Sequence, residues 1–288
     1  MRIVVDSGMD MPKKMIEKHN IKVVPLTLTL DGRTYVGEKE ITNEQFYDAL
    51  SKTESFPTTS TPSPGDFAEA YREVAKEDPD ILSIHISSGL SGTYGAAING
   101  GNLVPEANIT HIDSKTLSAM IGWQVEVAAK AIERGYSVDK IIKTLKDLNE
   151  KCNVMFTLKD LRNLRNSGRV SHLKGIIAAV LHIKPVITVS KDKGIYQTIT
   201  QQRTMSKAIK AVVDNLINMY GDNPVRIQLV NTGNPEDMKI LETMIREKIN
   251  ATFSPTLAAA TALGAHSGST LIGVVSGPLD YINNIFSE

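Results

Sequence analysis

Cysteine is almost absent from this sequence: Cys152 is the one cysteine among 288 residues. A single thiol excludes a disulfide within the chain and any zinc site built from several cysteines. The six histidines are spread along the chain without the spacing of metal ligands, so we expect no metal site. Because the N-terminus also lacks the pattern of a signal peptide, the sequence predicts a reducing, cytoplasmic location.

The sequence also lacks a surplus of charge of either sign and any long hydrophobic run. Lys and Arg together number 32, as do Asp and Glu, which gives a net charge of zero. A protein that follows a nucleic-acid backbone needs a basic surplus, so we expect no nucleic-acid partner. The longest apolar stretches fall well short of the about 18 residues of a membrane span. The glycine-rich signatures of P-loop and Rossmann phosphate sites are missing as well.

What is present predicts an α/β protein of two domains, because the chain is longer than a usual single domain. Strand-like and helix-like segments alternate up to about residue 150, which is typical of a mostly parallel sheet. We therefore expect an α/β domain over residues 1–152. The expected strands are residues 2–5, 22–30, 81–86 and 109–112, and the expected helices are residues 12–18, 64–74, 114–134 and 138–148.

The pattern changes after residue 152. Residues 184–190 and 195–201 are strand candidates joined by Lys191-Asp192-Lys193-Gly194, which is a hairpin signal. Further strands are expected at residues 154–158, 226–230 and 271–275, with a helix capped by Ser206 and another at residues 235–249. Antiparallel strands with helices predict an α+β domain over residues 153–288.

Two hydroxyl-rich segments indicate a site for an anion. The first is TTSTPSP (residues 58–64), just before a predicted helix, where free N–H groups and the helix dipole favour negative charge. The second is SSGLSGTYGAA (residues 87–97), here called the cradle, which follows a buried strand. Glycines there allow close backbone approach, and hydroxyls offer small donors. A polar turn closed by prolines and a capped short helix are the structural alternatives.

Three other polar residues are candidates for function. His266 lies among small residues in AHSGS, Arg203 follows a predicted strand, and Arg169 lies in NSGR. Considered alone, the histidine is typical of a hydrogen-bonded loop residue and each arginine of a solvated surface charge. A Ser91–His266 hydrolase is a further alternative, although GLSG around Ser91 does not match the G-x-S-x-G pattern of such enzymes.

Taken together, these motifs resemble the DegV family of bacterial fatty-acid-binding proteins. The resemblance rests on five segments in order across nearly the whole chain: TSTP from Thr59, SSGLSGTY from Ser87, DSK from Asp113, SGRVS from Ser167 and HSG from His266. Two positions depart from the family pattern. Gly8-Met9 replaces a hydroxyl residue in the opening D-S-T/S-x-D, and a serine follows Gly268 where a second glycine is common, giving Gly268-Ser269-Thr270.

The resemblance implies a carrier without catalytic activity or cofactor. Its ligand would be a long-chain fatty acid held in a tunnel between the two domains, and its partner a fatty acid kinase that forms an acyl phosphate for phospholipid synthesis. It also leaves room for transient contact with a membrane surface. Thr59, Ser91 and His266 would bind the carboxylate, with backbone N–H groups of Ser60 and Gly92, while Arg203 and Arg169 would dock the kinase. A lipid or small-molecule sensor without a kinase partner is the alternative.

Overall fold

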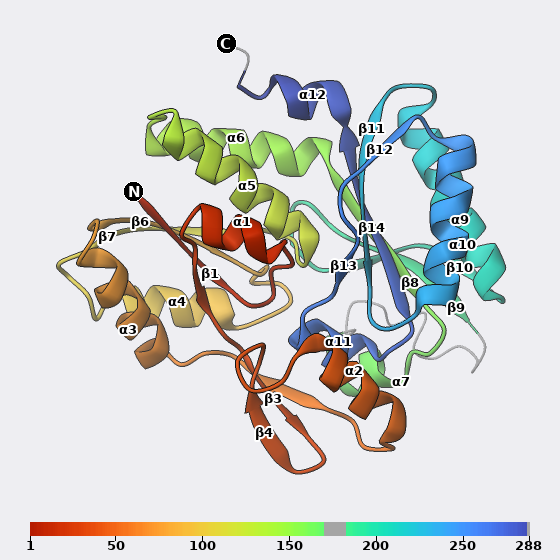
Figure 1. Ribbon diagram of the computed structural model, residues 1–288, viewed down its shortest axis with the longest axis horizontal. Helices are drawn as coiled ribbons and strands as arrows, with labels where there is room; N and C mark the ends of the chain where they lie inside the picture. Colours follow the sequence, from red (N-terminus) through yellow and green to blue (C-terminus); the bar gives the residue numbers. More distant parts are fainter. Residues whose placement is uncertain (170–182, 287–288) are drawn as a thin grey trace.

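A computed structural model describes residues 1–169 and 183–286, and it shows a mixed α/β fold (Figure 1). Its N-terminal part contains a four-stranded parallel sheet in the order β2-β1-β6-β7. The expected β-α-β opening is confirmed, because β1 and β2 are parallel and separated by α1. The elements are β1 (Arg2–Asp6), α1 (Lys13–Lys18), β2 (Lys22–Val24), β6 (Asp80–His85) and β7 (Asn108–Asp113).

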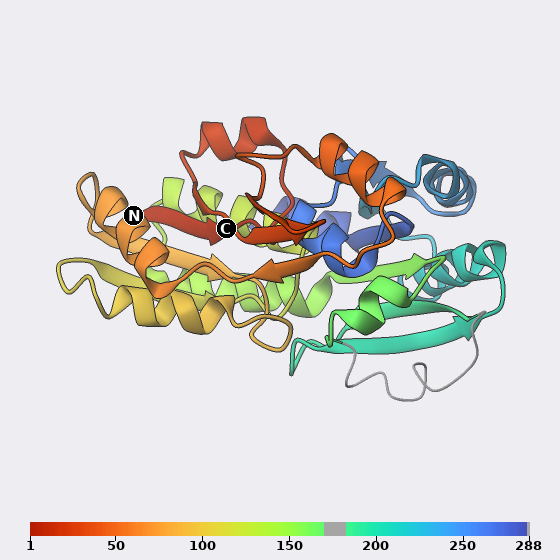
Figure 2. The same cartoon turned by 90° about the horizontal axis from the view of Figure 1, so that it is seen from below.

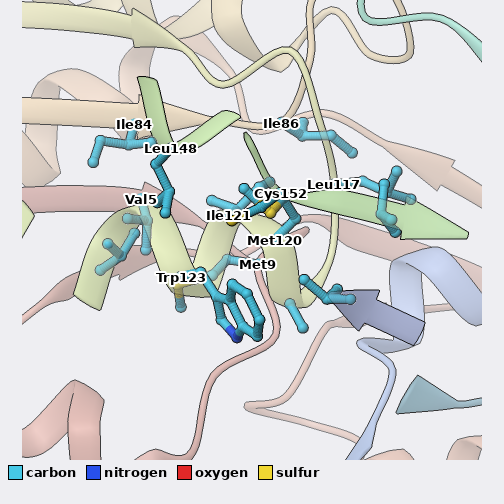
Figure 3. Packing of buried hydrophobic residues seen from close by; sticks show 14 of the residues in the cluster. Val5, Met9, Ile84, Ile86, Leu117, Met120, Ile121, Trp123, Leu148 and Cys152 are labelled. Carbon is cyan, nitrogen blue, oxygen red and sulfur yellow. The ribbon is translucent and has the colours of Figure 1, made fainter. Parts of the chain in front are cut away.

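Helices cover both faces of this sheet, as the alternation of side chains along β1 requires. Val4 packs with residues of α3 (Pro64–Ala75) and α4 (Thr93–Gly101) on one face. Ile3 and Val5 face α5 (Ala119–Glu133) and α6 (Val138–Lys151) on the other. Figure 3 shows Met120, Ile121 and Trp123 of α5 among the residues of this second cluster.

The C-terminal part forms a seven-stranded sheet in the order β10-β9-β8-β14-β11-β12, with β13 also paired to β11. The strands from β10 to β11 are antiparallel, so the predicted α+β character of this part is confirmed. The strands are β8 (Asn153–Leu158), β9 (Lys184–Val189), β10 (Tyr196–Gln202), β11 (Val225–Asn231), β12 (Ala251–Phe253), β13 (Leu257–Ala258) and β14 (Leu271–Pro278). In Figure 2, the β9–β10 hairpin lies in the right half of the molecule and β6 and β7 lie in the left half, and the hairpin turn reaches the end of β6.

The two faces of the large sheet meet different partners. Helices α9 (Met205–Tyr220) and α10 (Pro235–Lys248) bury one face and lie together on the right of Figure 1. Strand residues on the other face join the cluster that contains α5, so one hydrophobic core reaches from the four-stranded sheet to the seven-stranded sheet. The expected boundary between residues 152 and 153 stays a prediction.

A third, smaller sheet brings the TTSTPSP segment toward the C-terminal part. It has the order β4-β3-β5, with β3 (Thr27–Leu30), β4 (Arg33–Val36) and β5 (Thr58–Ser60). Beside it, α2 (Asn43–Lys52) contacts α11 (Thr261–Ser267), although more than 200 residues separate them along the chain (Figure 1). Within residues 1–169 and 183–286, the remaining helices are α7 (Arg162–Asn166) and α12 (Leu279–Asn284).

Three local predictions were wrong. Residues 22–30 form two strands in different sheets, because Pro25 lacks the N–H that a continuous ladder needs. Helix α5 starts at Ala119 instead of residue 114, since Lys115 and Ser118 have positive φ values that end a helix. Thr204, not Ser206, caps α9, because its hydroxyl accepts a hydrogen bond from the Lys207 N–H.

Among the described residues, no helix is both long and apolar enough to span a bilayer. The same residues contain no cluster of three or more His, Cys, Asp or Glu side chains that could hold a metal ion.

Candidate functional site

The predicted anion-binding segments meet at a small polar cavity of about 30 Å³. Its wall includes residues that follow β1 and β6, residues of β5 and just after it, and residues of α11. Its polar side chains are Thr59, Thr61, Ser91, Arg169 and His266. The other lining residues are Gly8, Leu26, Ile86, Leu90, Tyr196, Ala262 and Leu263. This polar cavity therefore joins Thr59, Ser91, His266 and Arg169, which lie far apart along the sequence.

Thr59 and His266 are in direct contact across this cavity. Thr59 Oγ1 and His266 Nε2 lie 2.8 Å apart in a hydrogen bond. Thr59 lies in β5, not in a loop at a helix start as expected, and β3 holds it through the Leu28–Thr59 pair. Burial, followed by the nearby positive charge of Arg169, lowers the pKa of His266 to about 4. The imidazole is therefore neutral at neutral pH, and either it or the hydroxyl donates the shared proton.

The second ring nitrogen of His266 makes no hydrogen bond to the described residues. This nitrogen, Nδ1, is buried and meets no hydrogen-bond partner among residues 1–169 and 183–286. In a Ser-His-Asp hydrolase a carboxylate holds that nitrogen, so the described residues lack the orienting group that a Ser91–His266 hydrolase needs. Ser83, His85 and Asp6 do form such a chain, with His85 Nδ1 3.0 Å from Asp6 Oδ2. All three side chains are buried in the core, away from any substrate.

Ser91 lies in the cradle just before α4. Its Oγ lies 2.8 Å from Thr93 Oγ1 and accepts a hydrogen bond from the Thr93 N–H. Gly92 is the N-terminal cap residue of α4 and makes no side-chain capping hydrogen bond, so Ser91 binds the first N–H of this helix from the position before the cap. Asp113 braces the cradle by accepting hydrogen bonds from Ser88 and from the backbone of Lys115. The DSK segment thus fixes the loop that presents Ser91.

The β9–β10 turn packs directly on the cradle. Ser87 Oγ donates a 2.7 Å hydrogen bond to the Gly194 carbonyl. Gly194 has φ +65°, and a Cβ built on it would lie 1.9 Å from Ser87 Oγ. The turn therefore requires glycine at this position, for both its conformation and the space.

We predict that Gly194→Ala lowers the free energy of unfolding by about 2 kcal/mol or more and loosens the cradle. Urea unfolding with far-UV circular dichroism measures this loss. Gly221→Ala is the matched control, because Gly221 also has a positive φ, +55°, but a Cβ at that position would meet no atom within 4 Å. Equal losses in the two variants would show that the contact with Ser87 adds nothing beyond backbone strain.

An apolar cavity of about 40 Å³ adjoins the polar cavity. The two cavities share Tyr196, Leu263 and His266. Burial raises the pKa of Tyr196 to about 12, so its hydroxyl stays protonated. The other lining residues are Leu117, Ser118, Val154, Phe156, Leu164, Val230, Thr232, Ala259, Ser267, Leu271, Gly273, Val274 and Val275. The polar cavity thus lies beside the apolar cavity, and residues of α11 and β10 form the wall that they share.

Of the remaining predicted residues, one lines the polar cavity and three do not. Ser60 is exposed on β5 and is not among the residues that line the polar cavity; instead its neighbours Thr59 and Thr61 line it. Gly92 is likewise not among the lining residues. Arg169 lines the polar cavity although it was expected at a partner surface. Arg203 is exposed between β10 and α9.

Sequence reasoning missed several lining residues. Thr61 was detectable, because the strand period of two places it on the same side as Thr59. Tyr196 and Leu263 give no such signal, since core residues have the same composition. Gly8, where a family hydroxyl is lost, lies on the wall of the polar cavity, so this departure changes its lining.

The chain matches known proteins over almost its whole length. A family model described as "Uncharacterised protein, DegV family" matches residues 1–278. A DegV domain-containing protein of Staphylococcus aureus is 33% identical over 274 residues, which cover 95% of this chain and 97% of that protein.

Solved structures of other proteins share the fold. A fatty-acid-binding DegV family protein from Thermus thermophilus has a TM-score of 0.87 and 28% identity, over 97% of this chain and 100% of that one. DegV of Bacillus subtilis, described as a fatty acid binding protein, has a TM-score of 0.86 and 28% identity, over 96% and 98% of the two chains. Sequence, fold and the order of the motifs agree, and the chain belongs to the DegV family.

Proposed function

We propose that this protein binds a long-chain fatty acid in the cytoplasm and presents its carboxylate to a separate fatty acid kinase. The observation that carries the proposal is the junction of the two cavities, one lined by hydroxyls, an imidazole and a guanidinium, the other apolar. A fatty acid has the same division into a charged head and an apolar tail. The fatty-acid-binding relatives support the same ligand class.

The polar cavity offers the donors that a buried carboxylate needs. Thr59 is free to donate its hydroxyl proton to the ligand when His266 carries its own proton on Nε2 and donates to Thr59 Oγ1. Ser91 supplies a second hydroxyl, and the positive charge of Arg169 lies on the same wall. Each charge-assisted hydrogen bond contributes about 1.5–3 kcal/mol.

The tail would lie in the apolar cavity, between the N-terminal and C-terminal parts of the chain. At about 0.8 kcal/mol per buried methylene, roughly fifteen methylenes give about 12 kcal/mol before the costs of ordering. Pockets for such ligands usually measure about 300–1,000 Å³. A cavity of about 40 Å³ must therefore widen, and Tyr196 and Leu263, on the wall shared with the polar cavity, are the side chains that must move apart.

The protein acts here as a carrier, and the kinase performs the phosphoryl transfer. A buried carboxylate is protected from water and from other enzymes, so the kinase must dock near the head group or induce its exposure. Exchange of the acid with a membrane surface would load the carrier. Arg203 and Arg169 are the proposed docking residues.

Native mass spectrometry of the purified protein, followed by lipid extraction, tests the ligand. We expect a bound mass that dissociates on denaturation and is recovered as an intact fatty acid at about one per chain. A protein that neither retains nor takes up a radiolabelled long-chain fatty acid would contradict the proposal. Labelling of Ser91 by an activated-serine probe would instead favour a hydrolase.

A further inference from the structure

Helix α11 carries residues of both cavities but does not cap its own N-terminus. Ala262, Leu263 and His266 all line the polar cavity from this helix. The cap residue is Ala260, whose side chain makes no capping hydrogen bond, and the first turn contains no acidic residue. Alanine is a poor cap, and the first backbone N–H groups of a helix need acceptors from elsewhere.

Two carboxylates from the N-terminal part of the chain supply these acceptors. Asp10 Oδ1 accepts a 2.7 Å hydrogen bond from the Ala260 N–H, and Glu38 Oε1 accepts one of 3.4 Å from the Thr261 N–H. Just before the helix, Tyr47 donates its hydroxyl proton to the Ala259 carbonyl at 2.8 Å. Negative charge at the start of a helix is favourable because of the helix dipole.

Asp10 is itself held in one place. It is buried, and its Oδ2 accepts a hydrogen bond from the Ser118 hydroxyl. Gly122 of α5 also packs against the Asp10 backbone, since a Cβ there would lie 2.3 Å from the Asp10 carbonyl oxygen. The carboxylate therefore fixes the start of α11 relative to β1 and α5.

The position of α11 decides where His266 lies, because the histidine is in the last turn of this seven-residue helix. His266 must stay within hydrogen-bond distance of Thr59, which belongs to the separate β3–β5 sheet. Without an anchor at its N-terminus, the helix and the residues just before it keep few polar contacts with the part of the chain that carries Thr59 and Ser91. Among the described residues these are the His266 contact, the Tyr47 hydrogen bond and a 3.5 Å hydrogen bond from Asn43 Nδ2 to the Ala258 carbonyl.

We infer that Asp10 and Glu38 are positioning residues of the polar cavity, which cap α11 from the other half of the chain and thereby hold His266 against Thr59. The effect expected on ligand binding rests on the proposed fatty-acid function, whereas the effects expected on α11 and His266 do not. Neither carboxylate is among the residues that line the cavities, so both act through α11.

The ionisation of Asp10 makes the stability of the protein depend on pH. Burial is the main cause that raises the pKa of Asp10 to about 7 from 3.8, and Glu38 adds to it, while Ser118 and Ala260 oppose it. Burial also raises the pKa of Glu38. Tyr47, the third titratable group that faces this site, has its pKa raised as well and stays neutral.

The raised pKa of Asp10 determines whether the free energy of unfolding rises or falls with pH. Between about pH 4 and pH 7 the folded protein holds a proton on Asp10 that the unfolded chain has lost. The free energy of unfolding therefore falls as pH rises through this window. Asp10→Asn removes this contribution to the pH dependence of the free energy of unfolding. Buried His266, whose pKa is lowered, makes the free energy of unfolding rise with pH in both proteins.

The test compares Asp10→Ala with Asp10→Asn. The amide of asparagine keeps an acceptor for the Ala260 N–H and offers a donor to Ser118, whereas alanine provides neither. In the ligand-free protein we expect Asp10→Ala to raise amide hydrogen exchange of residues 262–266 by about tenfold or more and to shift the His266 imidazole NMR signals. Asp10→Asn should retain the wild-type exchange and signals. Its free energy of unfolding should fall less, or rise more, than that of the wild type as pH increases from about 4 to 7.

Ser137→Ala is the matched control, because it removes the hydroxyl that caps α6, a helix that lies well apart from α11 (Figure 1). It should lower stability by a similar amount without changing α11 or His266. If Asp10→Ala does not fold, Glu38→Ala provides the weaker version of the same test. Unchanged exchange and His266 signals in the alanine variants would overturn the inference.

Fatty-acid affinity is the last readout. We expect Asp10→Ala to weaken binding of a long-chain fatty acid by about tenfold, and Asp10→Asn to restore most of the loss. Failure of the wild-type protein to bind the acid would remove the proposed function but leave the exchange and NMR tests intact. Altered α11 dynamics with unchanged affinity would show that the two carboxylates do not position the ligand site.

Discussion

Replacing both Thr59 and Ser91 by alanine is expected to give a folded protein that no longer retains a fatty acid. The two hydroxyls line the polar cavity from different elements, β5 and the cradle. Loss of two charge-assisted donors costs about 3–6 kcal/mol, which is roughly two to four orders of magnitude in affinity. The truncated Thr59 also leaves His266 Nε2 without its partner, which adds to the cost.

Lipid extraction of the purified variant and titration with a fluorescent fatty acid measure this loss, and circular dichroism verifies the fold. Ser60→Ala is the matched control, since Ser60 lies beside Thr59 on the same strand with its side chain exposed. It should bind the acid like the wild type. A double variant that still carries about one fatty acid per chain would place the head group elsewhere.

The fold was largely predictable because hydrophobic alternation and helical periodicity follow directly from how each segment packs. The parallel N-terminal sheet and the antiparallel C-terminal strands appear as expected. The errors lie where a local rule competes with tertiary contacts. Leu117 continues the apolar spacing of the helix that follows, yet Ser118 bonds to Asp10 and to the Gly8 carbonyl, which holds residues 114–118 in a loop.

The candidate site was predictable only through its polar residues. Thr59, Ser91 and His266 lie in recognisable motifs, and the structure brings them to one cavity. Asp10 ends the opening motif and Glu38 lies in none, but neither gave any indication of its role at α11, because their partners are backbone N–H groups of residues 260 and 261, more than 200 positions away. A contact between a side chain and a distant backbone leaves no pattern in a single sequence.

Arg203 lies where its replacement can test docking of the kinase without disturbing ligand binding. It follows β10, whose first residue, Tyr196, lines both cavities, so roughly 20 Å of strand separates it from Tyr196. Arg203 is not among the residues that line either cavity, so it is not placed to bind the carboxylate of the proposed ligand. It is exposed at the junction of a strand and a helix, where it can form paired hydrogen bonds with a carboxylate or phosphate of a partner protein.

We therefore expect Arg203→Ala to bind fatty acid like the wild type but to support acyl-phosphate formation at least about tenfold more slowly when mixed with the kinase and ATP. A docking defect should be relieved by a higher carrier concentration, which raises the apparent KM with little change in kcat. Arg203→Lys should restore the rate only in part, because an ammonium lacks the planar, paired donors. Lys207→Ala, which removes an exposed charge one turn into α9, is the control for a general charge effect. A wild-type rate for Arg203→Ala at every carrier concentration would show that Arg203 is a solvated surface charge without a docking role. Arg169, on the wall of the polar cavity, would then be the remaining candidate for contact with the kinase.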